Sequence, residues 1–86
     1  MNKPILDAID RKLPMRWEID YSRGSFCLML LARTYTYESG AERTRMLWRT
    51  YDARNAHYVH GEILRQGGKV TEPTPKALYE KWQEQE

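Results

Sequence analysis

Residues 43–65 read RTRMLWRTYDARNAHYVHGEILR, and this stretch decides how the chain folds. Its first part has the alternation of a β-strand, in which successive side chains point to opposite faces. Met46 and Trp48 are expected on the inner face. The outer face is then expected to hold Arg43, Arg45, Leu47, Arg49 and Tyr51. The first part of the stretch therefore predicts a strand with an arginine-rich outer surface.

The second part of the stretch predicts a helix. Asp52 is a favourable N-cap residue, and Gly67 and Gly68 are typical of a helix end near Gln66. The helix would bury a stripe formed by Ala56, Val59 and Ile63. A single helix over residues 41–66 is the alternative, although it would be unusually long and would leave the Asp52 cap unused.

The flanking sequence predicts the rest of an α+β fold. Before the stretch, Asn2 can cap a short helix with Pro4 in its first turn and with Leu6, Ile9 and Leu13 at helical spacing. Two further strands are expected. In residues 15–21 one face holds Trp17, Ile19 and Tyr21, and the other holds Arg16, Glu18 and Asp20. In residues 26–37 an apolar run ends in Thr34-Tyr35-Thr36-Tyr37, which is typical of a central strand that leaves the core at its far end.

After the stretch, Thr74 and Pro75 can open a C-terminal helix that docks through Leu78 and Trp82. The acidic end, residues 83–86, is expected to fray. The predicted fold is thus a short N-terminal helix, a three-stranded antiparallel sheet, one packed helix and a short C-terminal helix, all in one compact domain over residues 1–86.

Composition limits the functions that suit the chain. It has 86 residues, of which 41% are hydrophobic and 30% charged, as in globular proteins. Cys27 is the only cysteine, so an internal disulfide and a cysteine-based zinc site are excluded, and its apolar neighbours predict that it packs in the core. The longest apolar run, residues 26–32, is too short to span a bilayer. We expect a cytoplasmic protein without a membrane partner.

Positive charge is concentrated in the middle of the chain. The net charge is only +2, but residues 43–70 hold six basic and two acidic groups. Alternate residues on a strand lie about 7 Å apart, a spacing comparable to that of successive phosphates on one nucleic-acid strand. The expected binding residues are Arg43, Arg45, Arg49, Tyr51, Arg54 and His57. The competing interpretation is a solvated face on which these arginines pair with Glu18, Asp20 or Glu38.

The sequence offers little support for catalysis or for a bound metal. His57 and His60 would share one helix face, but a stable zinc site needs three or four ligands, so both are expected to be exposed or interfacial. No nucleophile–base pair and no cofactor motif is visible. We expect neither enzymatic activity nor a cofactor.

Two functions remain. The first is a nucleic-acid-binding accessory or regulatory protein that uses the arginine and aromatic sheet face. The alternative is a protein-interaction or inhibitor module, of the kind encoded by phages and other mobile elements, which would be homodimeric or would bind an acidic or nucleoprotein surface. The sequence leaves open whether the partner is DNA, RNA or protein.

Overall fold

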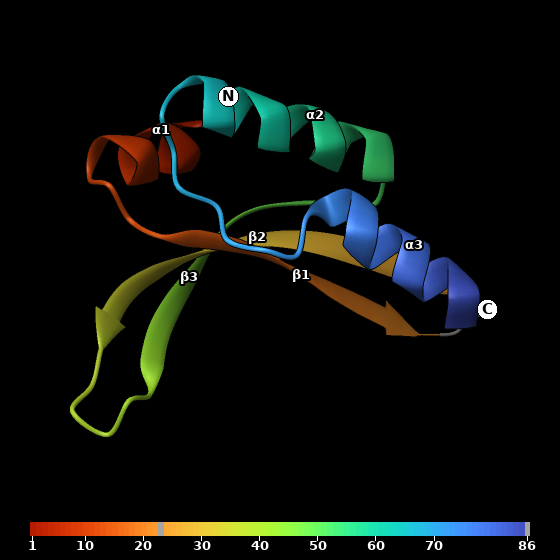
Figure 1. Ribbon diagram of the computed structural model, residues 1–86, viewed down its shortest axis with the longest axis horizontal. Coiled ribbons are helices and arrows are strands. Elements are labelled where there is room, and N and C mark those ends of the chain that lie inside the picture. The colour runs from red at the N-terminus through yellow and green to blue at the C-terminus, as the bar shows by residue number, and fades with distance from the viewer. Residues whose placement is uncertain (23, 86) are drawn as a thin grey trace.

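In the computed structural model, the part of the chain that is described, residues 1–22 and 24–85, forms three helices over one face of a three-stranded antiparallel sheet (Figure 1). The elements follow in the order α1 (Lys3–Asp10), β1 (Met15–Ser22), β2 (Ser25–Thr36), β3 (Glu42–Thr50), α2 (Ala53–Arg65) and α3 (Pro75–Gln85). The predicted α+β fold is therefore confirmed. The alternative of a single helix over residues 41–66 is wrong, because β3 occupies the first part of that range.

The helix boundaries follow from local capping. The side chains of Asn2, Asp52 and Thr74 each accept a hydrogen bond from a backbone N–H in the first turn of α1, α2 and α3, over 3.0, 2.8 and 3.1 Å. After α2, Gly67 has a φ of 84°, a conformation that favours glycine. The N–H of Gly68 then donates to the carbonyl of Ile63 over 2.9 Å, which closes the helix end.

The core lies between the sheet and the helices. Trp17 is 1% exposed, and the strand register places it opposite Leu30, so both point toward the helices. The other hydrophobic residues of the buried cluster come from all three strands and from the first two helices, and α3 contributes the buried Pro75. The buried set is Ile5, Ala8, Met15, Trp17, Leu28, Leu30, Ala32, Leu47, Ala56 and Ile63.

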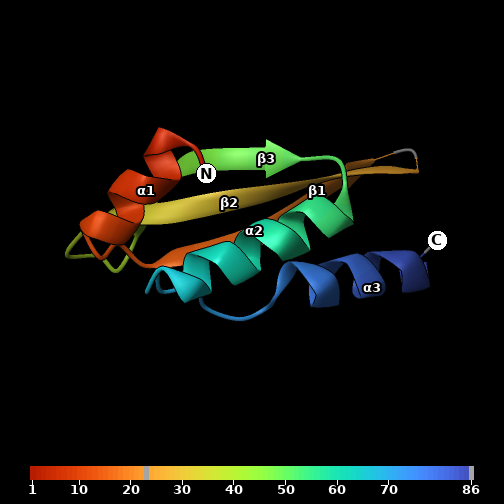
Figure 2. The same cartoon turned by 90° about the horizontal axis from the view of Figure 1, so that it is seen from above.

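Each helix contacts a different part of the sheet. Figure 2 shows α2 alongside α3, whereas α1 lies near β3 at the other side. The segment between α2 and α3 also joins the sheet, because Val70 forms a parallel bridge with Met15. Phe26, at the start of β2, packs against Tyr79 and Trp82 of α3 with ring centroids 5.1 and 4.9 Å apart. The predicted docking of α3 through Trp82 is thus observed.

Three local expectations differ from the structure. Leu6 is exposed, and Ile5 and Ala8 form the buried stripe of α1 instead. Cys27 is not a core residue: it lies opposite Asp20 on the face away from the helices and is only partly buried. Residues 83–85 belong to α3, where fraying was expected, and residue 86 lies outside the described residues.

Two register shifts change the faces of β2 and β3. On β3, Leu47 is an extra residue between the pairs Leu30–Trp48 and Leu31–Met46. On β2, Thr34 is an extra residue between the pairs Arg33–Thr44 and Tyr35–Arg43. Each such bulge reverses the alternation that follows it.

The predicted faces of residues 43–47 are wrong for this reason, whereas those of Trp48 and Arg49 are correct. Leu47 is buried at 7% exposure, although it was expected outside. Met46 was expected inside, but it is 46% exposed and lies opposite Leu31 on the uncovered side of the sheet. Arg45 lies opposite the buried Ala32, so it points to the side of the helices, whereas Arg49 lies opposite Met29 on the other side.

The uncovered side of the sheet is called the open face below. Cross-strand pairing and alternation assign its residues. Apolar side chains of the central strand lie in its middle, and charged side chains lie on both flanks. In the body of the sheet the open face comprises Arg16, Glu18, Asp20, Cys27, Met29, Leu31, Arg33, Met46 and Arg49, and toward the turn between β2 and β3 it continues with Thr36, Glu42 and Thr44.

Candidate functional site

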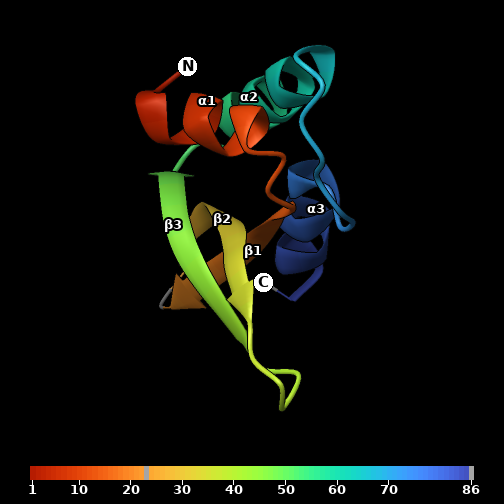
Figure 3. The same cartoon turned by 90° about the vertical axis from the view of Figure 1, so that its left-hand side faces the viewer.

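The far ends of β2 and β3 form an arm that extends beyond the helices. This hairpin arm, residues 33–46, projects from the body of the molecule in Figure 3. All of its side chains are classed as exposed. Backbone hydrogen bonds close its turn, where the N–H of Tyr37 donates to the carbonyl of Ala41 over 2.8 Å. The arm is therefore ordered backbone whose side chains remain accessible to a ligand.

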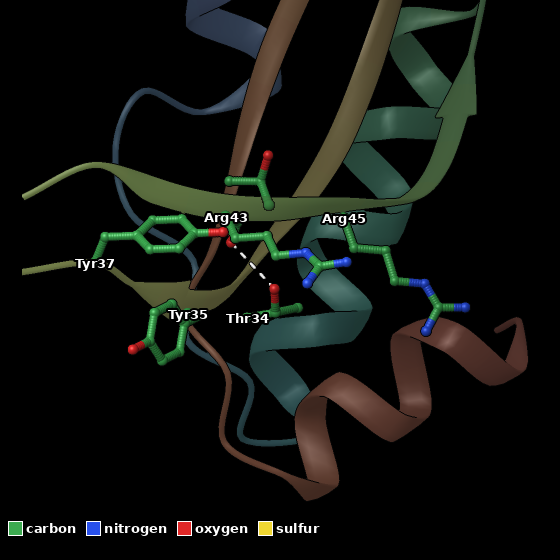
Figure 4. A pocket seen from close by; sticks show the side chains of 6 residues that line it. Thr34, Tyr35, Tyr37, Arg43 and Arg45 are labelled. Atoms are coloured by element: carbon green, nitrogen blue, oxygen red, sulfur yellow. Dashed lines mark hydrogen bonds between the residues drawn. The ribbon is translucent and has the colours of Figure 1, made fainter.

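One side of the hairpin arm combines two tyrosines with two arginines. Tyr35 and Tyr37 are 56% and 47% exposed, and their rings meet edge to face with centroids 5.0 Å apart. Arg43 lies directly opposite Tyr35 in the strand register. With Arg45, Thr34 and Thr44 these residues line a shallow hollow of about 690 Å³ (Figure 4).

The two bulges bring these side chains together. If Leu47 were paired in regular alternation, Arg43 and Arg45 would lie on the open face with Arg49. If Thr34 were paired in the same way, Tyr35 would lie on the open face beside Arg33. Both shifts turn the arm's side chains toward the helix side, at a point where no helix of the described chain covers them (Figure 3).

The arginines of this hollow are not neutralised. In residues 1–22 and 24–85, no carboxylate forms an ion pair with Arg43, Arg45 or Arg49. The expected pairing with Glu18, Asp20 or Glu38 is therefore not formed. Glu18 pairs instead with Arg16, over 2.9 Å.

A separate ion-pair network takes up the acidic groups near the arm. The carboxylate of Glu42 lies 3.0 Å from Arg16 and 3.2 Å from Arg33. The pKa of Arg16 is raised mainly by its hydrogen bond to Glu18; burial opposes this, and the charges of Glu18 and Glu42 add smaller increases. These pairs lie on the open face, so among the described residues they leave the arginines on the helix side of the arm without an acidic partner.

The other predicted binding residues lie elsewhere. Arg49 and Tyr51 line a hollow of about 240 Å³ with Asp20, Cys27 and Met29, at the far end of the open face. Arg54 and His57 line a hollow of about 430 Å³ between α2 and α3, together with Lys76, Tyr79, Glu80 and Gln83. The six predicted residues thus form three separate pairs, and of these three hollows only the one on the hairpin arm combines two arginines with two exposed tyrosine rings.

His60 has a structural role that the sequence did not reveal. The indole N–H of Trp17 donates to Nδ1 of His60 over 3.0 Å. Since this nitrogen accepts a hydrogen bond, the ring must be neutral. Burial lowers the pKa of His60, and the charge of His57 lowers it further, while Glu72 acts weakly in the opposite direction.

This contact predicts a loss of stability in mild acid. The pKa of His60 is lower in the folded protein than its ordinary value of about 6.5, so the unfolded chain binds the proton more readily. The stabilisation is complete above about pH 6.5 and is lost as the pH falls from there toward the folded pKa. We expect a decrease on the order of 1 kcal/mol, the usual net contribution of one hydrogen bond, in urea unfolding between neutral and mildly acidic pH.

A matched pair of variants identifies the group responsible. His60→Gln removes the titrating ring and retains an acceptor for Trp17, so the pH dependence in this window should largely disappear. His57→Gln removes only the smaller contribution, the charge of an exposed histidine of the same helix, and should leave most of the pH dependence in place. Equal pH dependence in the two variants would assign the effect to another group.

The described residues offer neither a metal site nor a membrane-spanning helix. Residues 1–22 and 24–85 contain no group of three or more histidine, cysteine, aspartate or glutamate side chains that could hold a metal ion. None of the helices in that part of the chain is long and apolar enough to cross a membrane. The hollow on the hairpin arm is lined by hydroxyls, phenol rings and guanidinium groups, which suit binding by stacking, hydrogen bonds and charge.

Sequence reasoning missed Tyr35 and Tyr37 as site residues. Their signal was present as the alternation Thr34-Tyr35-Thr36-Tyr37 at the end of an apolar strand. That pattern places two aromatic rings on one face, but the face they share with Arg43 depends on the bulges. Comparisons of the chain with protein-family models, with curated proteins and with solved structures gave no significant match.

Proposed function

We propose that this protein is a non-catalytic accessory or regulatory protein that binds single-stranded nucleic acid on the helix side of its hairpin arm. One observation supports this most: two exposed tyrosine rings lie beside two arginines that have no acidic partner in the described residues. Arg43 and Arg45 would bind phosphates about 7 Å apart. Tyr35 and Tyr37 would stack on bases.

A single strand suits this surface better than a duplex. Bases of a duplex are stacked on each other, so tyrosine rings reach them only where the strand is unpaired. The two rings meet edge to face, so each keeps a face accessible for one base. An acidic protein surface would also attract the arginines, but it would not require the exposed rings. The proposal includes a cytoplasmic location.

Titration of labelled single-stranded and double-stranded DNA and RNA at two salt concentrations tests the proposal. Single strands should bind more tightly, and affinity should fall steeply with salt, because each phosphate contact releases counterions. Fluorescence anisotropy measures both effects. Absence of binding even at low salt would sink the proposal and would leave an acidic protein surface as the ligand of the arm.

The tyrosines provide the more specific variant. Tyr35→Ala together with Tyr37→Ala should weaken single-strand binding by at least about fivefold, since base stacking on one aromatic ring is typically worth about 1–3 kcal/mol. The slope against salt should not change, because no charge is removed. Tyr58→Ala is the matched control: Tyr58 is 65% exposed but lies on α2, away from the arm. Equal losses in both variants would contradict a stacking role.

A further inference from the structure

The open face is a sheet surface that lacks a covering layer. In Figure 1 all three helices of the described chain lie on the opposite side of the sheet. The middle of the open face is apolar: Cys27, Met29 and Leu31 of the central strand are only partly buried, and Met46 is 46% exposed. Exposed apolar surface with charged flanks is typical of an interaction site.

The charges on this face have opposite signs on its two flanks. Met29 lies opposite Glu18 on one side and opposite Arg49 on the other, so the three residues form one row across the sheet. In and beside this row, β1 carries the acidic Glu18 and Asp20 and β3 carries the basic Arg49, whereas Arg16 and Glu42 pair with each other further along the face. Arg49 has no ion-pair partner in the described residues, and the side chain of Glu18 remains 45% exposed beside Arg16.

We propose that the open face binds a second copy of this chain, face to face, in a two-fold symmetric dimer. Rotation by 180° about an axis that runs parallel to β2, midway between the two sheets, places β1 of one copy over β3 of the other. Glu18 of each copy then faces Arg49 of its partner copy, and the two Met29 side chains meet at the axis. Sheets packed in this way lie about 10 Å apart, a gap that these long side chains fill.

The neighbouring row fits the same arrangement. Leu31 lies opposite Arg16 on β1 and opposite Met46 on β3. The rotation brings the two Leu31 side chains together and lays the aliphatic part of Arg16 against Met46 of the other copy. Arg16 keeps its own ion pairs with Glu18 and Glu42, so no charge is buried without a partner.

The charge pattern favours a second copy over an unrelated partner. A uniformly acidic partner would be repelled by the β1 flank, and a uniformly basic one by the β3 flank. A two-fold interface instead requires that each surface be complementary to itself, with opposite charges on either side of the axis and apolar residues on it. The Glu18–Met29–Arg49 row meets this requirement.

The size of the open face predicts a weak dimer. The 8 residues of β1 and the parts of β2 and β3 beside them correspond to a footprint of about 25 by 14 Å, or roughly 350 Å² for each copy. Stable complexes typically bury about 800 Å² per partner. We therefore expect a dimer that dissociates on dilution. Sedimentation equilibrium should show the mass rising with concentration from that of the 10.3 kDa chain toward twice that value.

Charge reversal at the two flanks tests the predicted geometry. Glu18→Arg places two arginines opposite each other at both ends of the row, and Arg49→Glu places two glutamates there. Each variant alone should dimerise at least about tenfold more weakly than the wild type. An equimolar mixture should form a heterodimer, because each of its two contacts then pairs an arginine with a glutamate. Native mass spectrometry distinguishes the heterodimer from either homodimer.

Controls separate this result from misfolding and from a general charge effect. The heterodimer itself requires both variants to be folded, and the double variant Glu18→Arg/Arg49→Glu should dimerise within about threefold of the wild type. Glu80→Arg makes the same charge change on α3 and should leave dimerisation unaltered. A wild-type mass that stays at one chain up to about 1 mM, single variants that dimerise normally, or a mixture that stays monomeric would each overturn the proposal.

The dimer and the nucleic-acid site are independent. Arg45 and Arg49 belong to the same strand but point to opposite sides of it. Arg45→Ala should weaken binding of a single-stranded oligonucleotide and leave the dimer intact. Loss of the dimer in this variant would contradict the assignment of Arg45 to the other face.

Discussion

Replacing Trp17 by alanine is expected to lower the free energy of unfolding by about 3–5 kcal/mol, the usual cost of removing a large aromatic side chain from a core. Trp17 is 1% exposed, meets Trp48 edge to face at 6.2 Å, and donates its N–H to His60. Small domains lose about 4–8 °C of Tm per kcal/mol. The Tm should therefore fall by roughly 12–40 °C.

Two further substitutions divide this effect into its parts. Trp17→Phe keeps most of the apolar volume and removes the N–H, so it should cost about 1–2 kcal/mol. Trp48→Ala removes the partner ring, which is only partly buried, and should cost less than Trp17→Ala. A loss below about 1 kcal/mol for Trp17→Ala would mean that this ring does not hold the sheet to α2.

Replacing Arg43 and Arg45 together by alanine is expected to weaken single-strand binding by at least about tenfold. The slope of affinity against salt should fall by about 1.4, at about 0.7 for each lost phosphate contact. The free energy of unfolding should change by less than about 0.5 kcal/mol, because both side chains are exposed. Fluorescence anisotropy across a salt series, with urea unfolding of the same samples, measures all three quantities.

The matched control removes the same charge from other places. Arg49→Ala with Arg54→Ala changes two arginines that the sequence grouped with Arg43 and Arg45, but that lie in the other two hollows. Their loss should reduce affinity by no more than about threefold, as expected from the change in net charge alone. Equal losses in the two double variants would show that binding depends on total charge and not on the hairpin arm.

The order of the elements was predictable because local signals determine it. Asn2, Asp52 and Thr74 cap the three helices, and the alternation of residues 15–21 correctly placed Trp17 inside. The faces of β3 were not predictable in this way. A bulge leaves no clear mark on composition, since Leu47 fits the outward position of an alternating strand as well as the buried one it occupies.

The candidate site was predicted only in part for the same reason. Arg43 and Arg45 were chosen for their charge, and that choice did not depend on the register. The residues that share a face with these two arginines did depend on the register. Tyr35 and Tyr37 lie on the same face as the arginines, and Arg49 lies on the opposite face, only because Thr34 and Leu47 are extra residues in the strand pairing. The register of a strand pair depends on how the two strands align, which the sequence of either strand alone does not specify.

The bulge at Leu47 means that the length of β3 determines its surface chemistry as much as its composition does. Gaining one residue that pairs regularly near this point would exchange the two sides of residues 42–46 without changing any other side chain, whereas losing Leu47 would remove the bulge and keep their sides. Point substitutions change a surface by one side chain at a time. In descendants of this chain, a single-codon insertion in β3 could therefore move the arginines from one face to the other in one step.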